Sequence, residues 1–148
     1  MKIIEPNSSA EFEQYYNLRY EVLRKPWLQP KGSEKDDDDK SSIHRMIIDE
    51  SNGKAVAVGR LQFNTNEEAQ IRYMAVSDNY QLKGYGNLIV KTLEDIALNK
   101  GIRNIILQAR ENPAESYNGL FSVGKQINAK PCIMYMMKIP MSPVLMRK

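Results

Sequence analysis

The stretch that decides the fold reads Gln70-Ile71-Arg72-Tyr73-Met74-Ala75-Val76, then Ser77-Asp78-Asn79-Tyr80, then Gln81-Leu82-Lys83-Gly84-Tyr85-Gly86-Asn87-Leu88-Ile89-Val90. This pattern predicts a strand, a polar turn, a loop with two glycines and an amphipathic helix. The first N–H groups of a helix lack intrahelical acceptors and lie at the positive end of the helix dipole. Because glycines there let a phosphate approach the backbone, the stretch predicts an anion-binding loop.

Two common phosphate-binding motifs do not fit this stretch. The dinucleotide fingerprint needs a third glycine three residues after Gly86, where this chain has Ile89. A P-loop needs Gly-Lys followed by Ser or Thr, whereas the chain reads Gly53-Lys54-Ala55 and Gly124-Lys125-Gln126. The pattern that fits is Gln/Arg-x-x-Gly-x-Gly/Ala after a strand that ends in an apolar residue, Ala and Val. Here the chain resembles the GNAT superfamily, the acyl-CoA-dependent N-acetyltransferases; the alternative is a glycine-rich turn before an ordinary helix.

Composition narrows the class of protein. The chain has 148 residues, 42% of them hydrophobic and 26% charged, which suits one globular domain. No apolar run approaches the ~20 residues that span a bilayer, and Pro6 interrupts the start too soon for a signal peptide, so we expect a cytoplasmic protein with no membrane partner. The net charge of +3 is dispersed, which disfavours nucleic-acid binding. Cys132 and His44 are the only cysteine and histidine, so we expect no metal site.

Periodicity and turn residues predict the order of the elements. The expected strands cover residues 2–5, 43–49, 55–63, 69–76, 104–109, 125–138 and 144–146. The expected helices run from a cap at Ser8 or Ser9 to about Arg24, over residues 84–99, and over a short segment that begins at Pro113. Residues 26–42 read as a polar loop. Its four aspartates at 36–39 are expected to lack local order, because adjacent like charges repel one another.

The resemblance implies the fold class as well. We expect an α/β protein of the α+β type, with residues 1–148 forming a single N-acetyltransferase (GNAT) domain. Its mixed, mostly antiparallel sheet would have six to seven strands, flanked by about four helices. The sheet would splay at the central strand, residues 69–76.

The resemblance further implies acetyl-CoA as co-substrate. The backbone of the central strand would bind the pantetheine arm like an added strand, and the loop would bind the pyrophosphate. The N–H near Met74 would polarise the thioester carbonyl. The implied CoA contacts are Met74, Ala75, Val76, Gln81, Leu82, Lys83, Gly84, Tyr85, Gly86, Asn87 and Asn112.

Two residues are candidates for proton transfer. Many GNAT proteins carry a Glu at the position of Gln70, which cannot take a proton; Glu68 shares its strand face and could act through water, or could be a solvated carboxylate. Family members also use a Tyr on the helix after the fifth strand as the acid for the thiolate. Aligning from Glu111 places that role on Tyr117, whereas aligning from Ala114 places it on Asn118. Tyr117 could instead be a core aromatic residue.

The acceptor side has weaker signals. Arg19 and His44 are candidate acceptor contacts, although a helix-surface ion pair and a structural histidine explain them equally well. The aspartates at 36–39 could favour cationic amines, or could form a solvated loop.

The predicted function is acetyl transfer from acetyl-CoA to a primary amine of a small molecule or peptide, by direct attack in a ternary complex. The alternatives are a non-catalytic acyl-CoA-binding or sensing module and an acyl-homoserine-lactone-synthase-like acyltransferase. Oligomeric state stays open, with a homodimer as one option.

Overall fold

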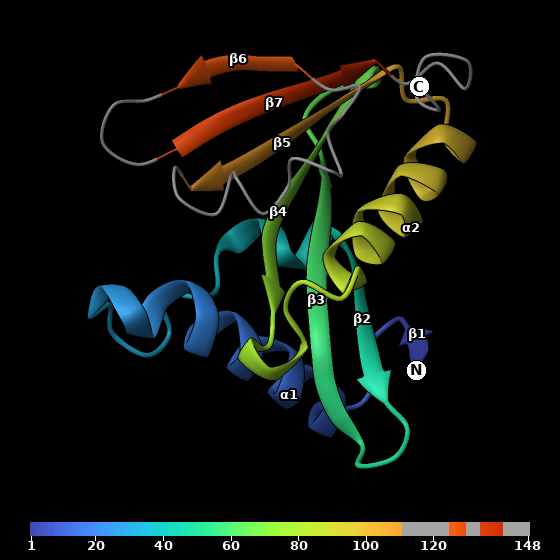
Figure 1. Ribbon diagram of the computed structural model, residues 1–148. Helices are drawn as coiled ribbons and strands as arrows, with labels where there is room; N and C mark the ends of the chain where they lie inside the picture. Colours follow the sequence, from blue (N-terminus) through green and yellow to red (C-terminus); the bar gives the residue numbers. More distant parts are fainter. Residues whose placement is uncertain (111–124, 130–133, 141–148) are drawn as a thin grey trace.

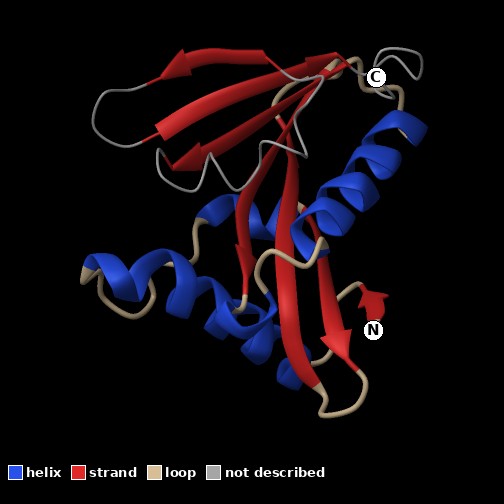
Figure 2. Cartoon of the chain, viewed as in Figure 1, coloured by secondary structure: helices blue, strands red, loops and turns tan. Residues whose placement is uncertain are grey.

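The structure, a computed structural model, describes residues 1–110, 125–129 and 134–140, with side chains as far as Leu107. Its described residues form a mixed sheet with one α-helix on each face (Figures 1 and 2). The sheet has the order β1-β2-β3-β4-β5-β7-β6. The strands are β1 (Lys2–Ile4), β2 (Ile43–Asp49), β3 (Lys54–Phe63), β4 (Glu68–Val76), β5 (Asn104–Arg110), β6 (Lys125–Ala129) and β7 (Met134–Pro140).

The two α-helices are α1 (Ser9–Arg19) and α2 (Tyr85–Asn99). Ser8 caps α1 in a capping box, in which the Ser8 hydroxyl accepts from the Glu11 N–H and the Glu11 carboxylate accepts from the Ser8 N–H. The expected end of this helix at Arg24 holds only in part, because α1 passes into a π-helical turn, η1 (Tyr20–Arg24), and a 3-10 turn, η2 (Lys25–Trp27). Two further 3-10 turns are η3 (Asp37–Ser41) and η4 (Asp78–Tyr80).

These elements confirm the expected α+β mixed sheet, with corrections. The described residues contain two α-helices rather than four, and the helix expected from Pro113 lies outside them. The strand expected over 125–138 is wrong, because β6 and β7 are separate strands that pair antiparallel with each other. The strand expected over 144–146 lies outside the described residues. No helix in the described segments is long and apolar enough to cross a bilayer.

The sheet opens beside β4. β4 pairs antiparallel with β3 along its length, but parallel with β5 only from Glu68 to Ile71, opposite Asn104 to Leu107. From Arg72 onward β4 has no pairing with β5, and β5, β6 and β7 turn away from its second half (Figure 1). The described residues therefore have the predicted splay at the central strand.

A β-bulge marks the point where the strands part. Val58 faces Ala75 and Arg60 faces Arg72, so that Gly59 alone lies opposite both Tyr73 and Met74. Tyr73 takes a positive φ of 54°, which is uncommon for a residue with a side chain and often marks a functional position.

Each helix closes one face of the sheet. Residues Tyr15 and Leu18 of α1 pack with Met46, Val58 and Ala75. The larger core lies under α2, where Ile89, Val90, Leu93 and Ala97 pack against Ile47, Val56, Ala57, Leu61, Ala69, Ile71, Met74, Ile102, Ile105 and Leu107. The side chain of Met74 thus belongs to the α2 face, and that face is filled beside it.

Gly59→Ala should destabilise the protein by about 1–3 kcal/mol, the usual cost of overpacking a close-packed core. A Cβ at this position would lie 2.5 Å from Ile89 Cγ2 and 3.1 Å from Leu93 Cδ1, so α2 would have to move away from β3. Urea denaturation measures the loss. In an Ile89→Ala background, where the clashing methyl is gone, the same substitution should cost less; an equal cost in both backgrounds would show that the close approach of α2 is not the cause.

Candidate functional site

At the open edge of β4, the backbone N–H and C=O groups of every second residue point away from β3. Ser77 N–H donates to the Val56 carbonyl at 2.8 Å, so Ser77 faces β3. The N–H and C=O of neighbouring residues point to opposite sides of a strand, and the Val76 carbonyl indeed accepts from Gln81 Nε2, outside the sheet, at 3.1 Å. Met74 therefore shares the orientation of Val76. The N–H groups of Met74 and Val76 therefore both point to the side of β4 from which β5 has separated.

The loop from this edge to α2 is shaped for an anion. Leu82 and Gly84 both have positive φ, 62° and 91°, a backbone alternation that curves successive N–H groups toward one side. Gly84 is the N-cap of α2, without a side-chain cap, and no described residue accepts a hydrogen bond from the N–H groups of Tyr85, Gly86 or Asn87. The segment 81–84 is exposed. It can hold a phosphate at the positive end of the α2 dipole.

The two glycines of this loop have different surroundings. A Cβ on Gly84 would meet no atom within 4 Å, but the positive φ there favours glycine. A Cβ on Gly86 would lie 3.6 Å from both Met74 Cε and Val76 Cγ2. These distances are ordinary van der Waals contacts, so packing does not require a glycine at this position, and the expectation that Gly86 lets a phosphate approach stays a prediction.

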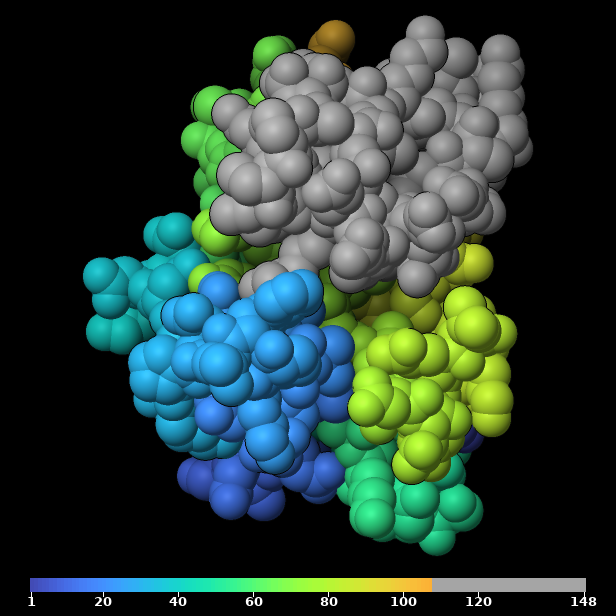
Figure 3. All heavy atoms as spheres, turned by 60° about the vertical axis from the view of Figure 1, so that its left-hand side comes forward, coloured from blue at the N-terminus to red at the C-terminus, as the bar shows by residue number. Residues whose placement is uncertain are grey.

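The open edge and the loop face the first helix across the surface. Figure 3 shows the blue atoms of α1 and the segment after it beside the yellow-green atoms around the start of α2, with green atoms recessed between them.

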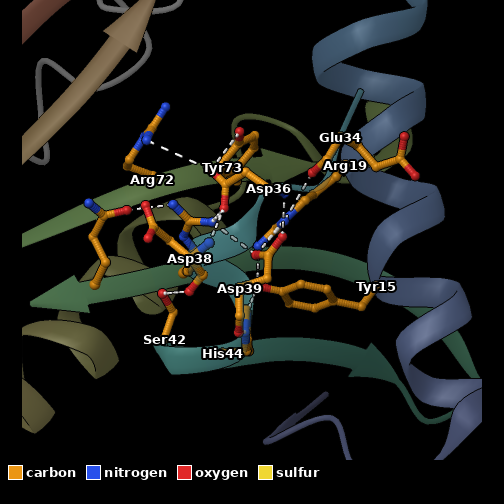
Figure 4. Close-up of polar contacts among 12 residues, drawn as sticks. Tyr15, Arg19, Glu34, Asp36, Asp38, Asp39, Ser42, His44, Arg72 and Tyr73 are labelled. Carbon is orange, nitrogen blue, oxygen red and sulfur yellow. Dashed lines mark hydrogen bonds and ion pairs between the residues drawn. The ribbon is translucent and has the colours of Figure 1, made fainter. Parts of the chain in front are cut away.

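A buried charge network holds the segment after α1 against this part of the sheet (Figure 4). Arg19 and Arg60 are both fully buried. Asp39 accepts from Arg19 at 2.9 Å and from Arg60 at 3.0 Å, and Asp36 accepts from Arg60. The Glu34 carbonyl accepts a further bond from Arg19 at 3.0 Å. A buried arginine is tolerated only when it is paired in this way.

The electrostatics of the two aspartates follow from these contacts. Burial alone would raise the pKa of Asp39, but the charge of Arg19 and the hydrogen bonds from the Asp36 N–H and both arginines hold this pKa below its ordinary value. Burial would likewise raise the pKa of Asp36, but the hydrogen bonds from Arg60 and Tyr73 and the charge of Arg60 outweigh burial and hold this pKa below its ordinary value. The expectation of a disordered acidic run is wrong here, because Asp36 caps η3 and two of the four carboxylates neutralise buried arginines.

Tyr15 and His44 extend the network under the sheet. His44 Nε2 lies 2.8 Å from the Asp39 carbonyl oxygen, which can only accept, so Nε2 carries the proton and Nδ1 accepts from the Tyr15 hydroxyl at 2.7 Å. Burial lowers the pKa of His44, which keeps the ring neutral at pH 7. Arg19 Nη2 donates to the Tyr15 hydroxyl at 3.1 Å. Arg19 and His44, expected at the acceptor, thus have internal partners, and we assign them to the framework of the site.

Tyr73 lies at the centre of four guanidinium groups. The distances from its ring centroid to the guanidinium carbons are 4.4 Å for Arg19, 4.7 Å for Arg60, 5.2 Å for Arg72 and 5.5 Å for Arg24. Its hydroxyl donates to Asp36 Oδ2 at 3.2 Å. The β-bulge thus places a cation-lined aromatic ring directly before Met74.

The structure places the other expected residues as follows. Glu68 lies at the closed end of the β4–β5 pair, where its carboxylate accepts from Asn64 Nδ2 at 3.1 Å. Met74 lies six positions further along the strand, roughly 20 Å at ~3.3 Å per residue. This separation does not support a role for Glu68 as the base, because a base must reach the amine directly or through one water. Tyr117 and Asn112 lie outside the described residues.

Sequence reasoning missed the parts of the site that depend on distant contacts. Arg60 carried a usable signal, because it is the only charged residue in the apolar run 55–61 of β3. A charge in such a strand predicts a buried ion pair. Nothing in the sequence marked Tyr73 as the residue at the bulge.

The sheet opens beside β4, and the loop next to this opening can hold an anion. Comparison with known proteins identifies the family. The model of the acetyltransferase (GNAT) family matches residues 12–120. The chain belongs to this family.

Solved structures agree on the fold. An aminoglycoside 6'-N-acetyltransferase complexed with coenzyme A is similar at a TM-score of 0.78 and 16% identity, over 97% of this chain and 98% of that one. Escherichia coli ElaA is similar at 0.72 and 18% identity, over 93% and 96% of the two chains. A GNAT family acetyltransferase from Elizabethkingia anophelis with acetyl-CoA bound is similar at 0.71 and 14% identity, over 94% and 97%.

Proposed function

We propose that the protein transfers the acetyl group of acetyl-CoA to a primary amine of a small molecule or peptide, by direct attack in a ternary complex. The observation that carries this proposal is the open edge of β4, which leads into the bare N-terminus of α2. Membership of the acetyltransferase (GNAT) family and the CoA-bound relatives support it.

In this proposal, different parts of the described backbone bind different parts of acetyl-CoA. Met74 and Val76 would bind the amides of the pantetheine arm as an added strand. The N–H groups of Tyr85, Gly86 and Asn87 would bind the pyrophosphate. The Met74 N–H would donate to the thioester carbonyl oxygen as negative charge develops there, and one such donor is worth about 3–4 kcal/mol of barrier.

Tyr117 is our proposed acid for the departing thiolate. A phenol with a pKa near ~10 is protonated at neutral pH and can donate to a thiolate whose thiol has a pKa near ~8.5. Tyr117→Phe should lower kcat about tenfold or more, the low end for a positioned acid, while the affinity for acetyl-CoA stays within about threefold. Steady-state kinetics and calorimetric titration check this. If the variant kept the wild-type kcat, Tyr117 would be a packing residue, and the alignment that places Asn118 at the position of the family's Tyr would be favoured.

The proposal is tested by incubating the protein with acetyl-CoA and a panel of primary amines and peptides. Thiol release coupled to a gain of one acetyl group by an amine supports acetyl transfer. CoA binding without thiol release for any amine would contradict it and leave a non-catalytic acyl-CoA-binding module. Preferential release with long acyl donors would indicate an acyl-homoserine-lactone-synthase-like activity.

A further inference from the structure

The cluster around Tyr73 has more positive than negative charge. Four guanidinium groups lie against this ring, and the carboxylates that the described residues place within ion-pair distance of them are Asp36 and Asp39. Glu34 is buried nearby, but its carboxylate accepts from the Gly32 N–H. Four guanidinium groups therefore share two carboxylates within ion-pair distance, and the cluster keeps a net positive charge even when Glu34 is counted.

The surplus belongs to two particular arginines. Arg19 and Arg60 have close carboxylate partners, whereas Arg72 Nη1 lies 3.9 Å from an Asp36 oxygen that already accepts from the Tyr73 hydroxyl. Arg24 makes no ion pair with a described residue; its Nε is buried and unpaired, like those of Arg19 and Arg60, so its terminal Nη groups are the donors left for a ligand. Both arginines have donors available for a ligand, held in place by the Tyr73 ring.

Their position matters because the acceptor must reach the acetyl group near Met74. The α2 face of β4 is closed there by Met74 and Ile89 of the core. The α1 face presents Tyr73 and Arg72, and η1, which ends at Arg24, lies beside it. The Arg72 side chain is 33% exposed, so a ligand can touch it.

We infer that Arg24 and Arg72 bind a carboxylate of the acceptor, so the amine that the protein acetylates belongs to an amino acid or a similar carboxylate-bearing molecule. This inference rests on the proposed acetyl transfer. A guanidinium group binds a carboxylate through paired, charge-assisted hydrogen bonds. Stacking on Tyr73 orients the guanidinium groups of Arg24 and Arg72 before the ligand binds.

The same charges disfavour a polycationic acceptor. Asp36 and Asp39 are already committed to Arg60 and Arg19, whereas Asp37 and Asp38 of the same run are exposed. An aminoglycoside-like amine at Arg24 and Arg72 would meet surplus positive charge there. The expectation that the acidic run selects cationic amines therefore rests on Asp37 and Asp38.

The test compares ligand pairs that differ only in the carboxylate: L-lysine with cadaverine, and L-phenylalanine with phenethylamine. Each is titrated calorimetrically into the protein saturated with CoA. We expect the amino acid of at least one pair to bind about tenfold tighter than its amine, and this preference to fall below about threefold in Arg24→Gln and in Arg72→Gln. Arg103→Gln removes the same charge at an exposed site beside Glu67, just before the start of β4, and should keep the preference.

Several results would overturn the inference: equal affinities within both pairs, no binding by any of the four ligands, a preference that survives in both variants, or a preference that Arg103→Gln also abolishes. A parallel loss of CoA affinity in the Arg24 and Arg72 variants would overturn it too, because the arginines would then hold the donor. Thiol release is measured separately on the same ligands. A tightly bound amino acid that releases no thiol would contradict acetyl transfer and leave the carboxylate site standing.

Discussion

Asp39→Asn should lower the free energy of unfolding by about 3 kcal/mol, the lower part of the range for breaking a buried ion pair from one side. The substitution leaves Arg19 and Arg60, both fully buried, without their shared carboxylate. The melting temperature should fall by about 10 °C, as expected for a domain of this size. Thermal and urea denaturation measure both quantities.

Asp37→Asn is the matched control, because Asp37 belongs to the same acidic run but is exposed. Its cost should stay within about 0.5 kcal/mol, as for most surface substitutions. Equal effects of the two substitutions would mean that the acidic run acts only through its total charge, and the buried network would then have no special role.

The ion pair between Asp39 and the buried arginines also predicts how the stability of the protein depends on pH. The pKa of Asp39 is lower in the folded state than in the unfolded chain, so its stabilising effect is complete above the unfolded pKa of about 4 and is lost as the pH falls through the folded value. The stability difference between wild type and Asp39→Asn should therefore be constant near neutrality and narrow below about pH 4. A difference that stays constant into strong acid would contradict the ion pair.

Asn87→Asp should weaken CoA binding more than tenfold, or by ~1.4 kcal/mol, without weakening the fold. Asn87 is the third residue of α2. It is exposed, and its N–H has no acceptor among the described residues. A carboxylate there interacts favourably with the helix dipole, by about 0.3–1 kcal/mol, but repels a pyrophosphate bound at the same N–H groups. Because the charges are exposed, the loss of affinity should shrink at high salt.

Asn99→Asp controls for the added charge, since it makes the same exchange at the exposed opposite end of α2. It should leave CoA affinity unchanged and slightly lower the stability of the fold. Calorimetric titration of both variants decides the matter. Similar CoA affinities of Asn87→Asp and wild type would contradict phosphate binding at the start of α2.

Local patterns predicted much of this fold. The alternation in β2, β3 and β4 and the Gly84 start of α2 follow from sequence signals within a few residues of each other, whereas the splay beside β4 was expected only from the family resemblance. The strand expected over 125–138 failed because Met134 to Pro140 carries enough apolar residues for a strand of its own, and periodicity does not show where a chain reverses.

The charged part of the site could not be predicted in the same way. Asp39 meets Arg19 and Arg60 from 20 and 21 residues away along the chain, so the acidic run looks self-repelling until the fold supplies its partners. Likewise, the Gly-x-Gly pattern marked the loop but could not show that Gly86 lies beside Met74 and Val76, since this depends on where those two side chains point.

The most direct measurement of the central claim is an amide NMR titration of the ¹⁵N-labelled protein with acetyl-CoA. The account predicts that the largest shifts fall on the amides of Met74, Val76, Tyr85, Gly86 and Asn87, because their N–H groups would gain acceptors. The amide of Ser77, which already donates to Val56 within the sheet, should move less than that of Val76 beside it. Binding that leaves the amides of Met74, Val76 and the start of α2 unshifted would contradict the account.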